Sequence, residues 1–152
     1  MEEAKTIRTL ILDTNVLISS LVRSEGITRA SLTILIHDEN CEVLAPAEVV
    51  EELSTHAQEI SHKANITRSL LEETLERLLE NVQLAPLSSY RNELQEASQF
   101  VRDEGDAPFA ALALVRSPSI IVTYNKKHFN SKRLMRRQVR VLTPVEALRS
   151  TP

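Results

Sequence analysis

Short apolar segments rich in β-branched residues alternate along this chain with longer segments of helical periodicity, and this alternation restricts the fold more than any other feature. The apolar segments do not alternate with polar residues, as strands with one solvated face do, so we expect them to be buried on both faces. Such strands occur in parallel sheets that helices cover on each side. The sequence therefore predicts an α/β domain, a three-layer α/β/α sandwich with a parallel central sheet.

The expected elements follow from periodicity and flanking residues. We expect strands at residues 9–12, 42–45, 82–85, 120–123 and 139–142. We expect helices at 15–22, 28–37, 67–80, 90–101, 106–115 and 144–148, and one more that Pro46 opens. Thr67 is a predicted cap for the leucine-rich helix that follows it. Leu70 and Leu71 of that helix point to different sides, and because one core cannot cover both sides we expect a homodimer.

Composition favours one domain. A chain of 152 residues with 42% hydrophobic content can bury a single continuous core, so we expect one domain over residues 1–152. No apolar run reaches the roughly 18 residues of a membrane-spanning helix, and the charged N-terminus does not resemble a signal peptide. We therefore expect a soluble, cytoplasmic protein. The single cysteine, Cys41, has no Cys or His neighbour at zinc-ligand spacing.

Charge and glycine content restrict the function further. The net charge of -3 argues against nonspecific coating of nucleic acid, which depends on clustered Lys and Arg. The last third nevertheless carries a basic run without acids, which either binds phosphates or forms a solvated surface: Lys126, Lys127, Lys132, Arg133, Arg136, Arg137 and Arg140. With only two glycines the chain has no glycine-rich phosphate loop, which argues against a Rossmann or Walker nucleotide site.

Four polar residues are placed where they could face one crevice. Asp13 ends the first predicted strand and Asn125 follows the fourth, while Asp106 begins a helix and Glu52 lies inside one. Ligands of open parallel sheets bind beyond the carboxyl ends of the strands. Each acid also has an ordinary explanation, because Asp13 and Asp106 can cap helices and Glu52 can be a solvated helix residue.

If the acids do gather, their chemistry is defined. Carboxylates close together repel one another unless a cation neutralises them. Oxygen ligands without His or Cys suit Mg²⁺ or Mn²⁺. Such ions activate water and stabilise the charge that develops on phosphate during phosphodiester hydrolysis.

The chain resembles PIN domains in four successive blocks. These are ILDTNVLI at 11–18, Pro46 with Glu52 six residues on, DAPFAALA at 106–113 and VTYNKKHF at 122–129. Their order and spacing match across nearly the whole chain. The resemblance implies a metal-dependent endoribonuclease that uses Mg²⁺ or Mn²⁺ to hydrolyse single-stranded RNA. It also implies either a VapC-like toxin with an antitoxin protein as partner or a related RNA-processing nuclease.

The resemblance assigns the acidic metal-site positions to Asp13, Glu52 and Asp106, which are the expected catalytic residues. The family commonly has a fourth acid where this chain has Asn125, whose amide oxygen can bind a metal but supplies no charge. Asp103, three residues before Asp106, is the candidate that compensates as a metal ligand.

Neighbouring polar residues receive supporting roles. The expected substrate-orienting residues are Thr14, Asn15 and Thr123, which also have ordinary explanations as turn, cap and strand residues. The expected RNA-binding residues come from the basic run: Lys126, Lys127, Arg136 and Arg137. His128 lies beside the predicted site and receives no role, because a metal ion makes a histidine base unnecessary.

Two other functions were compared with this one. Haloacid-dehalogenase-like phosphatases also place an Asp after the first strand, but they require a second Asp two residues later, where this chain has Asn15. A degenerate PIN domain that binds RNA or a partner protein without cleavage is the alternative that Asn125 supports.

Overall fold

Five strands form one parallel sheet in the computed structural model, which describes residues 6–23 and 25–150. The strands lie in the order β3-β2-β1-β4-β5. Their bounds are β1 Arg8–Leu12, β2 Cys41–Pro46, β3 Gln83–Ala85, β4 Ser119–Val122 and β5 Val139–Leu142. All four pairings are parallel, which confirms the predicted sheet.

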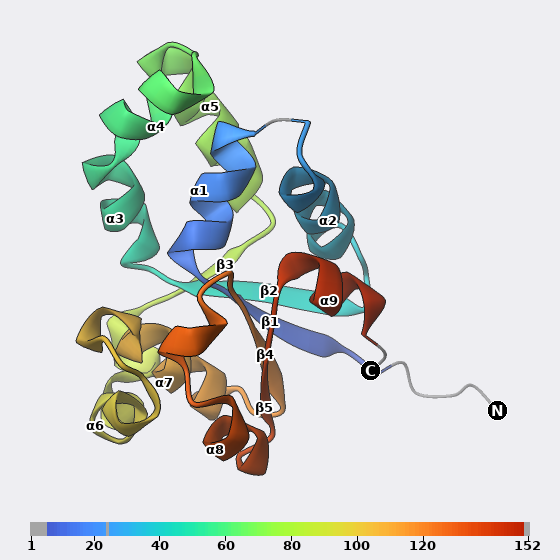
Figure 1. Ribbon diagram of the computed structural model, residues 1–152, viewed down its shortest axis with the longest axis vertical. Helices are drawn as coiled ribbons and strands as arrows, with labels where there is room; N and C mark the ends of the chain where they lie inside the picture. Colours follow the sequence, from blue (N-terminus) through green and yellow to red (C-terminus); the bar gives the residue numbers. More distant parts are fainter. Residues whose placement is uncertain (1–5, 24, 151–152) are drawn as a thin grey trace, which may run out of the picture.

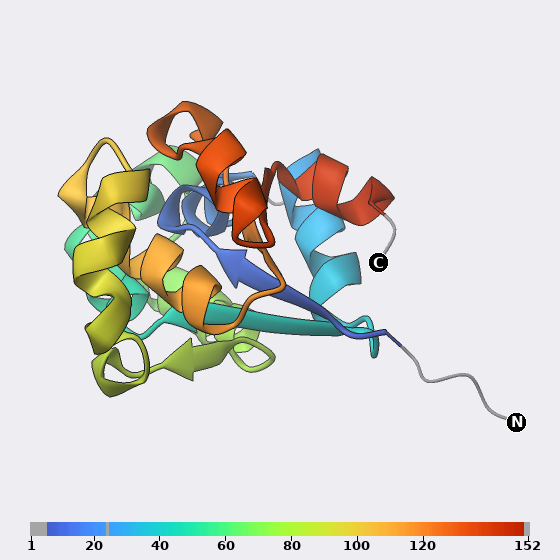
Figure 2. The same ribbon diagram turned by 90° about the horizontal axis from the view of Figure 1, so that it is seen from below.

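Helices cover both faces of the sheet. One face carries α1 Thr14–Val22, α2 Ile27–Ile36, α3 Val49–Thr55, α4 Ala57–Ala64, α5 Arg68–Leu79 and α9 Pro144–Arg149 (Figure 1). The other carries α6 Leu94–Ala97, α7 Ala107–Val115 and α8 Ser131–Arg136 (Figures 1 and 2). The predicted three-layer α/β/α architecture is therefore confirmed. No helix in the described residues combines the length and apolar character needed to cross a membrane.

The chain reverses direction across the sheet beside β1. From β1 it moves outward through β2 to β3, and it then returns to the other side of β1 as β4. Such a switch point leaves a crevice at the carboxyl ends of the two strands. Leu12 pairs with Val122, so the residues that follow them, Asp13 and Thr123, emerge side by side.

Pro46 does not open a helix as the sequence predicted. It is the last residue of β2, paired with Ala85, and α3 begins three residues later at Val49. The pairing of β2 with β1 ends at Leu44, so no ladder bond to β1 is needed where proline lacks its N–H.

The single helix predicted over residues 90–101 is also wrong. This segment consists of 3₁₀ turns at Arg91–Glu93 and Ser98–Phe100 on either side of the short α6. Its core-facing residues Leu94, Ala97 and Phe100 are spaced by three, the period of a 3₁₀ helix rather than of an α-helix. Two helices, α4 and α8, were not predicted.

Helix α5 confirms the prediction for residues 67–80. The Thr67 side chain accepts a hydrogen bond from the backbone N–H of Leu70 at 3.1 Å, as expected of a cap. Leu71 is 2% exposed and Leu70 is 47% exposed, so the two leucines do face different sides.

This difference generates a stability prediction. We expect Leu71→Ala to lower the free energy of unfolding by about 2–4 kcal/mol, because it removes buried methyl groups and leaves a cavity. The matched variant Leu70→Ala, on the same helix with the same change in propensity, should cost less than about 1 kcal/mol. Urea denaturation followed by circular dichroism measures both, and equal losses would contradict the assignment of the two faces.

Candidate active site

Asp13 lies at the centre of the crevice because β1 ends there. Its backbone N–H donates to the carbonyl of Val122 at 3.0 Å, which continues the pairing of β1 with β4. Its side chain is 4% exposed. One carboxylate oxygen accepts from the backbone N–H of Thr14 at 2.8 Å, and the other accepts from Asn15 Nδ2 at 3.0 Å and from Thr123 Oγ1 at 2.8 Å. Asp13 is thus both the cap of α1 and a buried, fixed carboxylate.

Glu52 reaches the same crevice from α3. Its Oε2 accepts a hydrogen bond from Thr14 Oγ1 at 2.8 Å, so the first residue of α1 joins the two acids through its backbone and its side chain. Glu48, four residues before Glu52, accepts a hydrogen bond from the hydroxyl of buried Tyr90 at 2.6 Å. Glu52 is therefore a half-buried residue whose carboxylate is held by a hydrogen bond.

Asp106 approaches from the start of α7. The alternative explanation as a helix cap is wrong, because its side chain makes no capping hydrogen bond. Its Oδ2 lies 3.2 Å from His128 Nδ1, and its side chain is 17% exposed. His128 was given no role from the sequence. Its position in the turn after Asn125 brings it to Asp106, which only the tertiary structure reveals.

The three carboxylates influence one another's ionisation. Burial raises the pKa of Asp13 above its ordinary value, the hydrogen bond from Thr123 offsets part of this, and the charge of Asp106 raises it further. Burial also raises the pKa of Glu52, and the charge of Asp13 adds to the effect. Burial raises the pKa of Asp106, His128 lowers it, and the charges of Asp103 and Glu52 raise it. Each acid is thus destabilised in its charged form by at least one of the other two.

This arrangement fits a hard divalent cation in its chemistry. The candidate ligands are the carboxylate oxygens of Asp13, Glu52 and Asp106, and a cation would offset the burial and the mutual repulsion that raise their pKa values. Within the described residues, no three His, Cys, Asp or Glu side chains stand close enough to hold an ion as they are placed. Each acid instead directs one carboxylate oxygen toward a Thr, Asn or His side chain. Such contacts are more favourable than bringing the mutually repelling carboxylates together.

The family model described as "PIN domain" matches residues 11–137, well over half of the chain. The chain belongs to the PIN domain family. Members of this family are generally nucleases and generally use divalent metals.

Two solved structures share the PIN fold of this chain. One is VapBC2 from Rickettsia felis bound to a DNA fragment from their promoter, with 16% identity, a TM-score of 0.58 and coverage of 88% of this chain and 98% of that one. The other is FitAcB from Neisseria gonorrhoeae, with 21% identity, a TM-score of 0.59 and coverage of 90% and 98%. No curated protein matches this chain.

The substrate-orienting residues predicted for this PIN domain all lie at the acids. Thr14 bonds Glu52, and both Asn15 and Thr123 bond Asp13. Asn15 Nδ2 also donates to Thr123 Oγ1 at 3.2 Å, which closes the network across the ends of β1 and β4.

The two residues predicted to complete the metal site lie at its edge. Asn125 is exposed, and its backbone N–H donates to Thr123 Oγ1 at 2.9 Å. Its side chain has no hydrogen-bond partner among the described residues. The Asp103 side chain accepts from the backbone N–H of Gly105 at 2.9 Å, and its charge acts on Asp106.

The predicted RNA-binding residues differ in their surroundings. Lys126 Nζ pairs with Glu146 of α9 at 2.9 Å, and Arg137 pairs with Glu96. Lys127 and Arg136 have no side-chain partner among the described residues. Lys127 also lines a hollow of about 370 Å³ together with Arg102, Lys132 and others, among them His128, which contacts Asp106.

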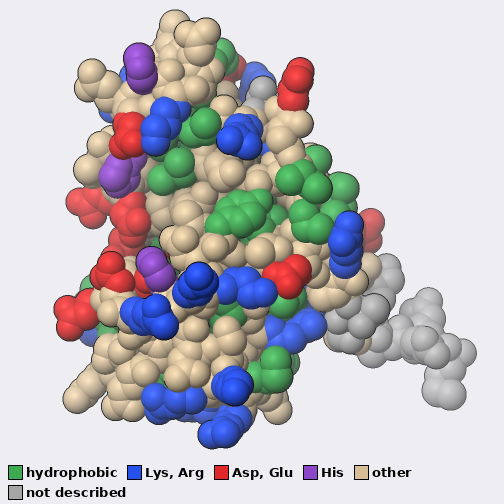
Figure 3. Space-filling model, viewed as in Figure 1, with side chains coloured by type: hydrophobic (Ala, Val, Ile, Leu, Met, Phe, Trp, Pro, Cys, Tyr) green, Lys and Arg blue, Asp and Glu red, His purple; other side chains and the backbone are tan. Residues whose placement is uncertain are grey.

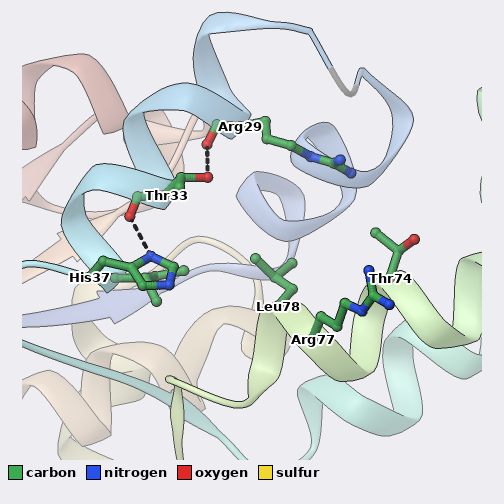
Figure 4. A pocket seen from close by; sticks show the side chains of 7 residues that line it. Arg29, Thr33, His37, Thr74, Arg77 and Leu78 are labelled. Carbon is green, nitrogen blue, oxygen red and sulfur yellow. Dashed lines mark hydrogen bonds between the residues drawn. The ribbon is translucent and has the colours of Figure 1, made fainter.

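A second cavity lies away from the acids. It has a volume of about 290 Å³ between α2 and α5, and Figure 4 shows Thr33 and His37 facing it from one helix and Thr74, Arg77 and Leu78 from the other. None of its lining residues belongs to the acidic network, so it is not part of this candidate site.

The raised pKa of Glu52 generates a pH prediction. An acid whose pKa is higher in the folded state than its ordinary value of 4.5 loses stabilisation as the pH rises through the interval between the two values. The Glu52→Gln variant lacks this loss, and its amide oxygen can still accept from Thr14. We expect its Tm to exceed that of the parent by about 2 °C or more at pH 7.5 and by less at pH 4.

The control for this experiment is Glu51→Gln, which changes the exposed neighbour of Glu52 on the same helix. It should leave the Tm nearly unchanged at both pH values. A Glu52→Gln Tm gain that is the same at pH 4 and pH 7.5 would show that the ionisation of buried Glu52 is not the cause.

Proposed function

We propose that this PIN domain is a divalent-metal-dependent endoribonuclease that hydrolyses phosphodiester bonds of single-stranded RNA, with Asp13, Glu52 and Asp106 as its catalytic and metal-binding residues. One observation carries the proposal. Three acids, at the end of β1, in α3 and at the start of α7, each have a pKa that is raised by burial and by the charge of another of the three. A protein tolerates such mutual destabilisation at functional sites, where a cation or substrate relieves it.

The residues around the acids hold them in place. When bound, Mg²⁺ or Mn²⁺ supplies activation of water and neutralisation of the phosphate charge. Thr123 and Asn15 fix the Asp13 carboxylate, and Thr14 fixes Glu52. His128 contacts Asp106. These bonds limit the motion of the acids.

Asn125 and Asp103 set the charge of the site. We include both in the proposed metal site, where Asn125 offers a neutral amide oxygen and Asp103 a negative charge beside Asp106. An acid at position 125 would add a second negative charge to that of Asp103 and bind a cation more strongly. The neutral Asn125 therefore weakens metal binding.

The basic side chains supply contacts for the RNA backbone. We propose Lys126, Lys127, Arg136 and Arg137 as RNA-binding residues, since positive charges beside an acidic site attract a polyanion and hold its phosphates. Lys127 is the most direct of them, because it lines the same hollow as His128, which contacts Asp106. Arg102 and Lys132 line that hollow too, and we add them to the proposed track.

The first test removes the acids one at a time. We expect Asp13→Asn, Glu52→Gln and Asp106→Asn each to lower kcat/KM for metal-dependent cleavage of an unstructured RNA by about 100-fold or more, because each removes a charge that binds the ion. Glu51→Gln is the control and should cleave at the parent rate. Parent-level cleavage by any one of the three variants, in a fluorescence assay with a quenched RNA, would remove that acid from the mechanism.

The second test separates free from paired basic residues. Replacing Lys127 and Lys132 with Ala should raise KM about 10-fold and reduce its salt dependence, with a much smaller effect on kcat. Replacing Lys126 and Arg137 with Ala, an equal loss of charge, should raise KM less, because these two side chains are engaged with Glu146 and Glu96. Equal KM values for the parent and the Lys127, Lys132 variant would show that RNA does not follow the hollow.

A degenerate PIN domain that binds RNA or a partner protein without cleavage is the second candidate. The observation in its favour is Asn125, which stands uncharged and without a side-chain partner among the described residues. A parent protein that binds RNA but does not cleave it in Mg²⁺ or Mn²⁺ would establish this candidate. Cleavage gained by Asn125→Asp would then identify the missing charge as its cause.

We further propose that the protein is the toxin of a toxin–antitoxin pair, with an antitoxin protein as partner, and that it forms a homodimer. The PIN fold shared with VapBC2 and FitAcB supports the first part. The 47% exposure of Leu70 on α5 supports the second, because this leucine lies outside the core of its own chain. Sedimentation velocity that shows only a monomer at about 50 µM, well above an ordinary Kd for a stable pair, would overturn the homodimer.

A further inference from the structure

The aromatic side chains of this chain are divided in an unusual way. Of the five, Tyr90, Phe100, Phe109 and Phe129 are between 1% and 5% exposed and belong to the core. The fifth, Tyr124, is 42% exposed. Burying an aromatic ring is favourable, so a single exposed ring among four buried ones suggests a binding role more strongly than scattered exposed leucines do.

Tyr124 lies directly beside the acids. It follows Thr123 and precedes Asn125 at the carboxyl end of β4. Its backbone N–H donates to Asn15 Oδ1 at 3.1 Å, and Nδ2 of the same amide group donates to Asp13 at 3.0 Å. One side chain therefore connects the backbone of Tyr124 to the central carboxylate.

The far end of the ring is fixed as well. Its hydroxyl is hydrogen-bonded to Thr28 Oγ1, and Thr28 is a buried residue in the first turn of α2. Ile27, next to Thr28, is 64% exposed. Figure 3 shows hydrophobic side chains in the middle of this face between α1 and α9, with a group of Lys and Arg side chains directly below them. The ring is thus held at both ends and still has open surface.

Such a ring has the properties of a stacking surface for nucleobases. Aromatic side chains beside a basic groove bind unpaired bases by stacking, whatever the base, because every base has a flat π-face. A ring whose rotation is already restricted loses little entropy on binding. Paired bases are stacked within their own helix, so this contact is available only to single strands.

We infer that Tyr124 binds a nucleobase of single-stranded RNA by stacking, beside the acids. The inference rests on the proposed function, of which it names a substrate contact. The phosphates then meet the basic side chains while one base packs on the ring. The contact raises affinity for single strands without selecting a sequence.

Variants at one position test the stacking contact. We expect Tyr124→Leu to weaken binding of a labelled uridine decamer by about fivefold to a hundredfold, the range for loss of one base–aromatic stack. Tyr124→Phe keeps the ring and loses only the hydroxyl, so its affinity should stay within about twofold of the parent. Leu87→Ala, which alters another side chain that is 42% exposed, is the matched control and should bind as the parent does.

A modified RNA separates stacking from a structural effect. In a decamer of equal length and charge, abasic ribose at alternate positions should weaken binding to the parent and to Tyr124→Phe, but it should weaken binding to Tyr124→Leu much less. Fluorescence anisotropy gives all of these affinities without any requirement for cleavage.

Three outcomes would overturn the inference. They are parent-like affinity of Tyr124→Leu for the uridine decamer, equal weakening by Tyr124→Leu and Tyr124→Phe, or a parent protein that binds no single-stranded RNA. Parent-like affinity of the Leu variant would leave the ring as a contact for a protein partner instead. A parent that binds RNA through Tyr124 but does not cleave it would overturn the proposed function alone.

Discussion

The buried carboxylate of Asp13 is the interaction on which the rest of the site depends. It sits where the paired strands β1 and β4 end, and it collects hydrogen bonds from Thr14, Asn15 and Thr123. A charge removed from water is costly unless donors surround it, and each bond to a charged group contributes about 1.5–3 kcal/mol. The three donors offset much of this cost, and in doing so they connect α1 to the end of β4. The same bonds therefore stabilise the fold locally and orient the acid.

The remaining acids act against this stability. Glu52 and Asp106 bring two more carboxylates toward a group that is already difficult to ionise, and the pKa values of all three rise. Nothing in the packing requires this, because neutral residues of the same shape would fill the same space. Proteins retain such local conflict at functional sites, where a stability cost accompanies activity. A bound cation would lower the cost of ionising these three acids.

Positive charge on this protein has two uses. Lys126 and Arg137 pair with Glu146 and Glu96, which ties the segment after β4 and helix α8 to their neighbours. Lys127 and Lys132 line an open hollow beside Asp106. A run of basic residues in the sequence is therefore not one surface. Tyr124, anchored through Asn15 and Thr28, adds the one exposed Tyr or Phe ring of the described residues to this face.

The sequence by itself determined the architecture and the family. Buried strands without alternation require a parallel sheet with two covered faces, and the order of the motifs matches a PIN domain, which is the basis for proposing Asp13, Glu52 and Asp106 as the site. The end of β2 at Pro46 and the 3₁₀ turns around α6 were decided by pairing and packing with distant segments, which local periodicity does not contain. The role of His128, the separation of paired from free lysines, and the position of the Tyr124 ring were likewise tertiary decisions. Each depends on which residue lies next to it in space. In the bond from Tyr124 to Asn15 the partner is 109 positions away along the chain, and local sequence spacing does not predict such a contact.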